Sequence, residues 1–197
     1  MPAPRSTSRD LALVATFAGV VAALGLIPAV LPPGVPVPIT AQSLGVMLAG
    51  SILGARRGFG ALALFLVLVA VGLPLLAGGR GGLGVFLGPS VGFLLGYPVC
   101  AGIIGYLVER GGSPYRLPWG IFANVIGGIV VLYAFGIAGM VAVAHLSVGA
   151  AVIANSWYVV GDAVKAVIAA LVARGVHAAY PSLLGASRSR DAEPTTV

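Results

Sequence analysis

Long runs without a charged residue dominate the pattern of polar and apolar positions. No Asp, Glu, Lys or Arg occurs in residues 11–55 (45 residues), 58–79 (22), 81–108 (28) or 117–161 (45). One helix that crosses a bilayer needs about 20 mostly apolar residues. Each of the two longer runs can therefore hold two crossings, and each shorter run can hold one. The pattern predicts an all-α integral membrane protein, built as a bundle of six transmembrane helices.

The turns between spans set their boundaries. The spans are expected near residues 10–28, 39–55, 58–75, 89–108, 118–136 and 161–180. The first turn is marked by prolines that cannot remain in a helix: Pro28, Pro32, Pro33, Pro36 and Pro38. The turn after the fifth span is marked only by Gly136, Gly139 and His145. Residues 137–160 therefore leave room for a short helix at the membrane surface.

The remaining segments are tails. We expect a cytoplasmic N-terminal tail at residues 1–9, a six-helix membrane domain at residues 10–180, and a disordered polar C-terminal tail at residues 181–197. No soluble domain is expected in addition to these.

The cationic residues predict the orientation, because Lys and Arg in short loops favour the cytoplasmic side. With six spans and an N-terminus inside, nine of the eleven fall on that side: Arg5, Arg9, Arg56, Arg57, Arg110, Arg116, Arg174, Arg188 and Arg190. Only Arg80 and Lys165 fall elsewhere. Both termini are therefore predicted to be cytoplasmic, and the net charge of +6 needs no nucleic-acid partner.

The composition excludes several classes of protein. It is 59% hydrophobic and 8% charged, whereas a soluble domain carries about 25% charged residues. The sequence contains no GxxxxGK[ST] phosphate loop and no nucleophile–base set, so an enzyme is not expected. His145 and His177 fall on opposite sides of the membrane, and Cys100 lies alone within a span, so no metal site is expected.

Asp162 and Lys165 are the only charges between Arg116 and Arg174. They are placed at the start of the sixth span, where Asp162 would cap the helix. A separation of three residues puts them about 60° and ~4.5 Å apart on one helical face, so an ion pair is expected. Ionisable residues within a membrane usually face a cavity and mark a substrate path. Either the pair is structural alone, or it also presents an acceptor and a donor to a ligand such as a cyclic urea.

Other polar groups are predicted on the outer side. Gln42, at the entry to the second span, is expected to point into a polar cavity, since an amide facing lipid would be costly. Arg80 lies in the glycine-rich loop 78–84, and is either a clamp for a ligand carboxylate or an ordinary exterior residue. Trp157 and Tyr158 are expected at the membrane interface, with stacking on a ligand as the alternative, and Asn124 is expected to hydrogen-bond another helix.

Small residues form two rows along the first span: Ala15, Gly19 and Ala23 in one, Ala18 and Ala22 in the other. Small residues on one face let another helix approach closely. The rows serve either packing within the bundle or docking of a separate membrane subunit.

Three blocks, in order, carry a family resemblance: "VPITAQSLGVMLAGSILGARRG", "GLPLLAGGRGGLGVFLGPSVGFLLGYP" and "GDAVKA". Over residues of about 10–175 the chain resembles BioY, the biotin-specific substrate-binding subunit of energy-coupling-factor (ECF) vitamin transporters. The resemblance implies a six-helix subunit that binds biotin from outside, as transported ligand rather than cofactor. It also implies a membrane coupling subunit and two cytoplasmic ATPase subunits as partners.

The resemblance also assigns roles to residues. It places Gln42, Asp162 and Lys165 among the ligand-binding residues, and the small residues of the first span on the docking surface for the coupling subunit. Arg80 is proposed from its own chemistry alone. The block "GPSVGF" departs from the "GPTGGY" common in the family, so no role is carried over to it.

The predicted function is therefore biotin uptake across the plasma membrane of a prokaryote, by a multi-pass protein that has no enzymatic activity. Two alternatives remain. The same scaffold could serve another vitamin (thiamine, riboflavin or pantothenate), or the chain could be a stand-alone ion-coupled carrier with Asp162 as the titrating group.

Overall fold

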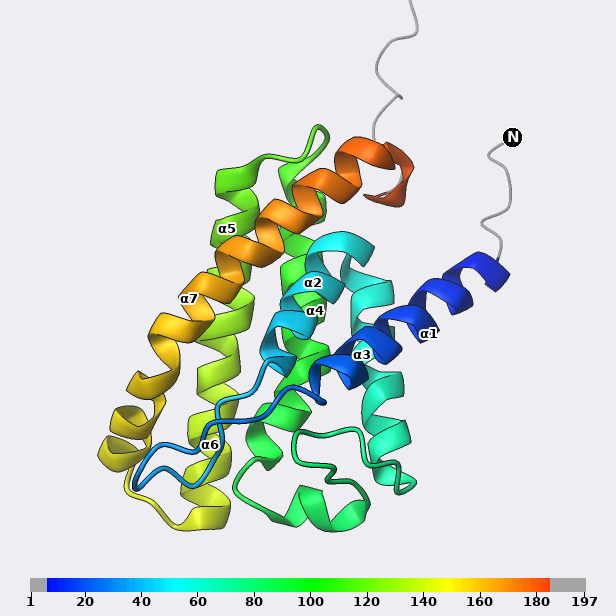
Figure 1. The fold of residues 1–197 in the computed structure, drawn as a ribbon. Coiled ribbons are helices and arrows are strands. Elements are labelled where there is room, and N and C mark those ends of the chain that lie inside the picture. Colours follow the sequence, from blue (N-terminus) through cyan, green and yellow to red (C-terminus); the bar gives the residue numbers. More distant parts are fainter. Residues whose placement is uncertain (1–6, 185–197) are drawn as a thin grey trace, which may run out of the picture.

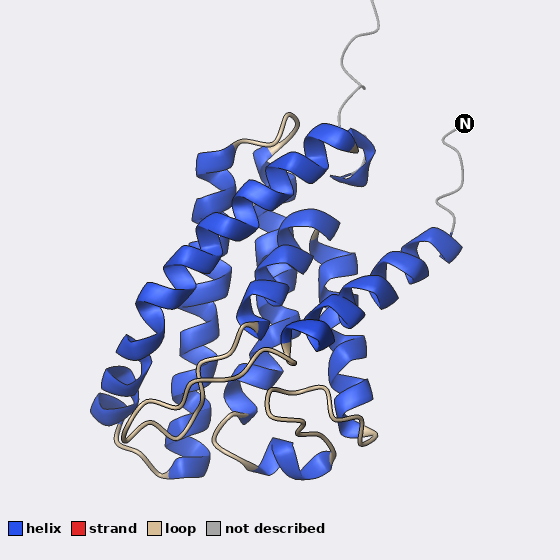
Figure 2. Cartoon of the chain, viewed as in Figure 1, coloured by secondary structure: helices blue, strands red, loops and turns tan. Residues whose placement is uncertain are grey.

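The computed structural model describes residues 7–184, which form helices joined by loops (Figure 1 and Figure 2). Within this range six helical elements make up the bundle, and the predicted fold class is confirmed. They are α1 (Thr7–Leu24), α2 (Gln42–Leu53), α3 (Ala55–Ala70), α4 (Val91–Gly111), the continuous element α5–η2–α6 (Leu117–Val125, Ile126–Val131 and Leu132–Ala144) and α7 (Val148–Ala179). The 3₁₀ helices η1 (Leu83–Leu87) and η3 (Pro181–Leu184) lie before α4 and after α7.

The two ends of the bundle differ in structure. Figure 1 shows the start of α1, the end of α7 and the α4–α5 turn at one end, with α1 crossing the other helices obliquely. The long loops 25–41 and 71–90 lie towards the opposite end. Isolated β-bridges, Val30 to Ile39 and Leu76 to Arg80, fold each of these loops back on itself.

Length and composition make three of these elements able to cross a bilayer: α1, α4 and Leu117–Ala144. The apolar helix α2 has 12 residues, about 18 Å, and is shorter than a hydrocarbon core of about 30 Å. The irregular segment before it is buried only in part: Val35 and Val37 are 6% and 5% exposed, whereas Val30 and Leu31 are 63% exposed. Gln42 and Ser43 are 1% and 8% exposed, so the start of α2 lies inside the bundle.

The last turn of the bundle lies at residues 145–147, so the predicted N-terminal boundary of the sixth span, residue 161, is wrong. His145 adopts a left-handed conformation (φ 52°) that ends α6. The Ser147 side chain then accepts a hydrogen bond from the Ala150 backbone N–H at 3.2 Å, which caps α7. Residues 137–160 thus belong mostly to α6 and α7, and form no separate surface helix.

Gly136 and Gly139 misled the prediction because they serve helix packing rather than a turn. Both lie inside α6. A Cβ added to Gly139 would collide with the backbone of Gly92 on α4, and one added to Gly136 would collide with the Phe93 ring. These glycines let α6 and α4 cross at close range.

A buried polar link joins three helices in the half of the bundle away from the long loops. Asn124 of α5 accepts a hydrogen bond from the Ser51 hydroxyl of α2 at 2.8 Å and donates one to the Ala166 carbonyl of α7 at 3.2 Å. The predicted interhelical hydrogen bond of Asn124 is therefore confirmed.

Parts of the predicted tails are helical. Helix α1 begins at Thr7, within the predicted tail 1–9, and η3 occupies the first residues of the predicted tail 181–197. The other tail residues, including Arg5, Arg188 and Arg190, lie outside the described residues.

Candidate functional site

Asp162 and Lys165 project from the middle of α7 into the bundle, and not from a first helical turn as predicted. Their side chains are 6% and 16% exposed, and Lys165 Nζ lies 2.9 Å from Asp162 Oδ1. The predicted ion pair is confirmed. The helix-capping role suggested for Asp162 is wrong, because α7 begins at Val148.

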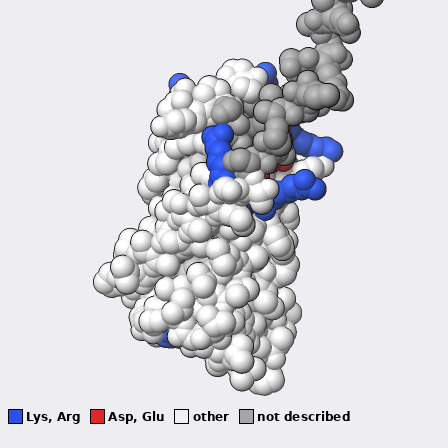
Figure 3. All heavy atoms as spheres, turned by 90° about the vertical axis from the view of Figure 1, so that its right-hand side faces the viewer, with Lys and Arg blue, Asp and Glu red and all other residues white. Residues whose placement is uncertain are grey.

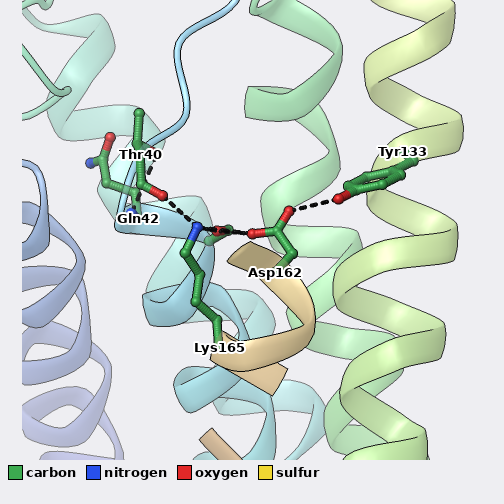
Figure 4. Close-up of polar contacts among 6 residues, drawn as sticks. Thr40, Gln42, Tyr133, Asp162 and Lys165 are labelled. Atoms are coloured by element: carbon green, nitrogen blue, oxygen red, sulfur yellow. Dashed lines mark hydrogen bonds and ion pairs between the residues drawn. The ribbon is translucent and has the colours of Figure 1, made fainter. Parts of the chain in front are cut away.

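Every polar atom of the pair has a protein partner. Lys165 Nζ donates to the Thr40 carbonyl at 2.8 Å, to Ser43 Oγ at 2.9 Å and to Asp162 Oδ1 at 2.9 Å. Asp162 Oδ1 also accepts from Ser43 Oγ at 2.9 Å, and Oδ2 accepts from the Tyr133 hydroxyl at 3.0 Å. Figure 4 shows these groups converging from α7, α6 and the start of α2. The contacts offset the desolvation of two buried charges.

The pair lines a pocket between α2, α4, α6, α7 and the two long loops. The polar part of the wall includes Thr40, Ser43, Arg80, Ser90, Asp162 and Lys165. The apolar part includes Val37, Ile39, Leu76, Phe93, Leu94 and Leu132. An apolar wall with a few convergent polar groups is typical of small-molecule sites.

The free volume of this pocket is about 50 Å³, whereas sites for small organic ligands span roughly 300–1,000 Å³. A ligand larger than a few water molecules therefore requires the walls to separate. In the loop wall, Gly78, Gly79 and Gly82 hold positive φ angles of 79°, 69° and 83°, a conformation that glycine adopts without a steric penalty.

Gln42 lies against the pocket, but its amide is engaged by backbone groups. Nε2 donates to the Val21 carbonyl at 3.3 Å and to the Leu75 carbonyl at 3.1 Å, and Oε1 accepts from the Ala77 N–H at 3.3 Å. The side chain is buried, as the cost of an unpaired amide requires. Gln42 thus ties the end of α1 to the loop 71–82, and its predicted contact with a ligand stays a prediction.

Arg80 lines the same pocket from that loop. Its backbone pairs with Leu76, and its Nε donates to the Ala77 carbonyl at 3.2 Å. The residue is exposed, and Nε is the guanidinium nitrogen that the loop fixes. Arg80, Asp162 and Lys165, the three charges that were predicted to bind a ligand, therefore line one pocket.

The two rows of small residues on α1 separate into different environments. Ala18 and Ala22 face the bundle and join its core, which favours the packing alternative for this row. Ala15, Gly19 and Ala23 are exposed, and a Cβ added to Gly19 would have no atom within 4 Å. Packing within the bundle therefore does not explain the small side chains of the exposed row.

Three aromatic residues, Phe93, Tyr133 and Tyr158, form part of the site, and sequence reasoning proposed a ligand contact only for Tyr158, as the alternative to an interface position. Tyr158 is buried, donates to the Val37 carbonyl at 2.6 Å and contacts the rings of Phe93 and Tyr133 edge-on. Its predicted place at the membrane interface is wrong, although the neighbouring Trp157 is exposed. Helical spacing from Asp162 gave a usable signal for Tyr158, since residues four apart share a face. No local spacing relates Tyr133 to Asp162.

Comparison with known proteins identifies the family. The sequence matches the BioY family over residues 1–182. The chain belongs to the BioY family. Among its relatives, the biotin transporter BioY of Rhizobium etli is 50% identical over 182 residues, which cover 90% of this chain and 97% of the relative. The biotin transporter BioY of Rhodobacter capsulatus is 47% identical over 186 residues, which cover 89% and 97%.

A solved structure has the same fold, the S-component for biotin from an ECF-type ABC transporter. It matches this chain with a TM-score of 0.85 and 25% sequence identity, over 90% of this chain and 95% of that one. The resemblance recognised from three sequence blocks is therefore confirmed. As a BioY chain with several helices able to span a bilayer, this is a multi-pass membrane protein.

Proposed function

We propose that this protein is the biotin-binding S component of an ECF-type transporter, and a transport protein rather than an enzyme. Membership of the BioY family supports this function, as does the likeness to a solved biotin S-component. The structural observation that carries it is the Asp162–Lys165 ion pair, buried on α7 and facing a pocket with apolar walls.

The pair suits the ureido ring of biotin. A carboxylate offers about four acceptor positions, and the protein uses three on Asp162, so one is left for a ureido N–H. All three protons of Lys165 are taken by protein acceptors. A ureido carbonyl bound by Lys165 therefore replaces one of these acceptors, and we assign this to the Thr40 carbonyl, the one of the three that lies in a loop rather than on a helix.

The rest of the ligand matches the remaining walls. Biotin joins its ureido ring to a carboxylate through an apolar thioether ring and chain, and Phe93, Leu94 and Leu132 supply apolar surface. At the other end, Arg80 presents the terminal nitrogens of a guanidinium, which suit a carboxylate in a bidentate pair. We assign the carboxylate of biotin to Arg80, and to Gln42 the support of the loop that carries it.

The charge distribution supports insertion in a prokaryotic plasma membrane with both termini in the cytoplasm. On the face that Figure 3 shows, most of the visible Lys and Arg side chains gather towards the end of the molecule where α1 begins. Arg9, Arg56, Arg110, Arg116 and Arg174 lie near helix ends or in the turn on this side. The positive-inside tendency makes this end cytoplasmic, and the pocket then lies in the outer half of the bundle.

The partners follow from the ECF-type assembly. This chain lacks a phosphate loop, so the proposed energy source is a module of one membrane coupling subunit and two cytoplasmic ATPase subunits. The exposed row Ala15, Gly19 and Ala23 on α1 is the proposed docking face for the coupling subunit, because small side chains allow close approach of another helix. Ala18 and Ala22 support that face from within the bundle.

Equilibrium binding of labelled biotin to the detergent-solubilised protein tests the ligand. We expect saturable binding that unlabelled biotin displaces and that thiamine, riboflavin and pantothenate do not. Displacement by one of those vitamins, with no effect of biotin, would replace the proposed ligand. Uptake by cells then tests energisation: the proposal expects dependence on the ATPase subunits, and a requirement for a proton gradient alone would favour the stand-alone carrier.

A further inference from the structure

Tyr133 of α6 holds the carboxylate oxygen of Asp162 that the ion pair leaves free. Its hydroxyl donates to Asp162 Oδ2 at 3.0 Å, whereas Lys165 and Ser43 both bind Oδ1. Figure 4 shows the Tyr133 hydroxyl pointing at Asp162 from the neighbouring helix. The carboxylate is therefore fixed at both oxygens, and by two different helices besides its own.

A regular helix could not direct both polar residues of α5–η2–α6 at α7. Asn124 reaches the Ala166 carbonyl and Tyr133 reaches Asp162, and these two α7 positions lie four residues apart on one face. Asn124 and Tyr133 are nine residues apart. At about 100° per residue they would project to opposite sides of a straight α-helix.

The π-helix η2, at Ile126–Val131, lies between these two residues and changes the register. A π turn accommodates one extra residue, so nine residues cover the rotation of about eight. The angle between Asn124 and Tyr133 then falls from about 180° to roughly 80°. Both side chains can therefore approach α7, as their hydrogen bonds record.

The sequence of the π-helix suits its place in the core. Gly127 packs against the Ile104 side chain and the Cys100 carbonyl of α4, and Gly128 packs against Met47 of α2. A Cβ on either glycine would collide with these neighbours. Two adjacent glycines thus allow a locally wider helix to fit between α2 and α4 without displacing them.

We propose that Tyr133, turned towards α7 by the π-helix, is a positioning residue for ligand capture. It holds the Asp162 carboxylate in the plane and rotamer that meet a ureido N–H, and it leaves Lys165 directed at the ureido carbonyl. This role rests on the proposed biotin function and extends it to a residue that lies outside the ion pair. Tyr133 acts through Asp162.

The matched variants Tyr133→Phe and Tyr106→Phe test the proposal, since each removes one hydroxyl. Tyr106 lies on α4, where its exposed ring contacts Arg110 away from the pocket. The first measurement is the infrared carboxylate stretch of the ligand-free protein, with the Asp162 band identified by its loss in Asp162→Asn. Five Asp and Glu residues in the whole chain keep that spectrum simple.

We expect Tyr133→Phe to shift the Asp162 band and to weaken biotin binding about tenfold or more, the effect of one hydrogen bond to a charged group. Tyr106→Phe should change neither. An unshifted band overturns the proposal, and so does a shifted band with unchanged biotin affinity, which would leave Tyr133 a role in folding alone. If the unmodified protein itself fails to bind biotin, the proposed function is refuted, and the positioning role with it.

Discussion

Lys165 Nζ and Asp162 Oδ1 lie 2.9 Å apart on one face of α7, about halfway along a helix of 32 residues. Both charged side chains are therefore far from the helix ends and largely buried. The two residues are close because side chains three residues apart share a helical face. Their other hydrogen bonds come from residues far away in the sequence. Lys165 donates hydrogen bonds to Thr40 and Ser43, which lie more than 100 positions earlier in the chain.

Removal of the negative charge should weaken ligand capture. Asp162→Asn keeps the shape of the side chain but replaces one acceptor oxygen with a donor, next to the Lys165 ammonium. We expect the dissociation constant for biotin to rise by about 10- to 100-fold, the range for hydrogen bonds to charged groups. The matched control is Asp10→Asn, which breaks the Asp10–Arg57 pair outside the pocket. Equal affinities of the two variants for biotin would contradict the assignment.

Removal of the positive charge should destabilise the protein even without ligand. Lys165→Met leaves a buried carboxylate without its cation, a change that costs about 3–5 kcal/mol in buried pairs. The double variant Asp162→Asn/Lys165→Met removes both charges and should unfold at a higher temperature than Lys165→Met. Thermal unfolding of the ligand-free proteins in detergent compares the two unfolding temperatures. A lower unfolding temperature for the double variant would show that the unpaired Asp162 charge does not cause the loss of stability in Lys165→Met.

Arg80 should recognise the carboxylate end of the ligand. The unmodified protein is expected to prefer biotin over biotin methyl ester, and Arg80→Gln should reduce that preference by about tenfold, the effect of a charged hydrogen bond. The control is Arg56→Gln, which removes an exposed arginine at the other end of the bundle. Competition binding with biotin and biotin methyl ester gives the ratio of the two affinities for each variant. An unchanged ratio in Arg80→Gln would place the carboxylate elsewhere.

A substitution on the exposed row of α1 should impair docking of the coupling subunit and leave biotin binding intact. Gly19→Leu adds a side chain to open space, so the purified variant should bind biotin within about twofold of the parent, the range of surface changes. Uptake by cells that also express the coupling module should fall strongly, because the added side chain obstructs helix–helix contact. Gly149→Leu, an equally open glycine on α7, serves as control. Normal uptake by Gly19→Leu would place the docking face elsewhere.

The sequence allowed the number of spans and the ion pair to be predicted, because both depend on local rules. Charge-free length sets the count of crossings, and a spacing of three residues sets the common face of Asp162 and Lys165. The start of α7 was missed because His145 and Ser147 give weak turn signals beside Gly136 and Gly139, whose small size serves the crossing with α4.

The remaining features of the site depend on contacts between distant parts of the chain. The contact of Tyr133 with Asp162 requires the register change in η2, and no helical periodicity encodes a π turn. Gln42 was expected to point into a polar cavity; it lies against the pocket, but its amide is bound by backbone atoms of Val21, Leu75 and Ala77. Backbone groups carry no sequence signature, so this support of the loop could be seen only in three dimensions.

The buried pair on α7 has an electrical consequence for the transport cycle. Moving one elementary charge through a membrane potential is worth about 2.3 kcal/mol per 100 mV, but the charges of Lys165 and Asp162 sum to zero. A shift of α7 along the membrane normal therefore transfers no net charge through these two groups. The carboxylate of the vitamin and the guanidinium of Arg80 also sum to zero. If they move together, that step should not respond to the membrane potential, and it should respond only if one of them moves without the other.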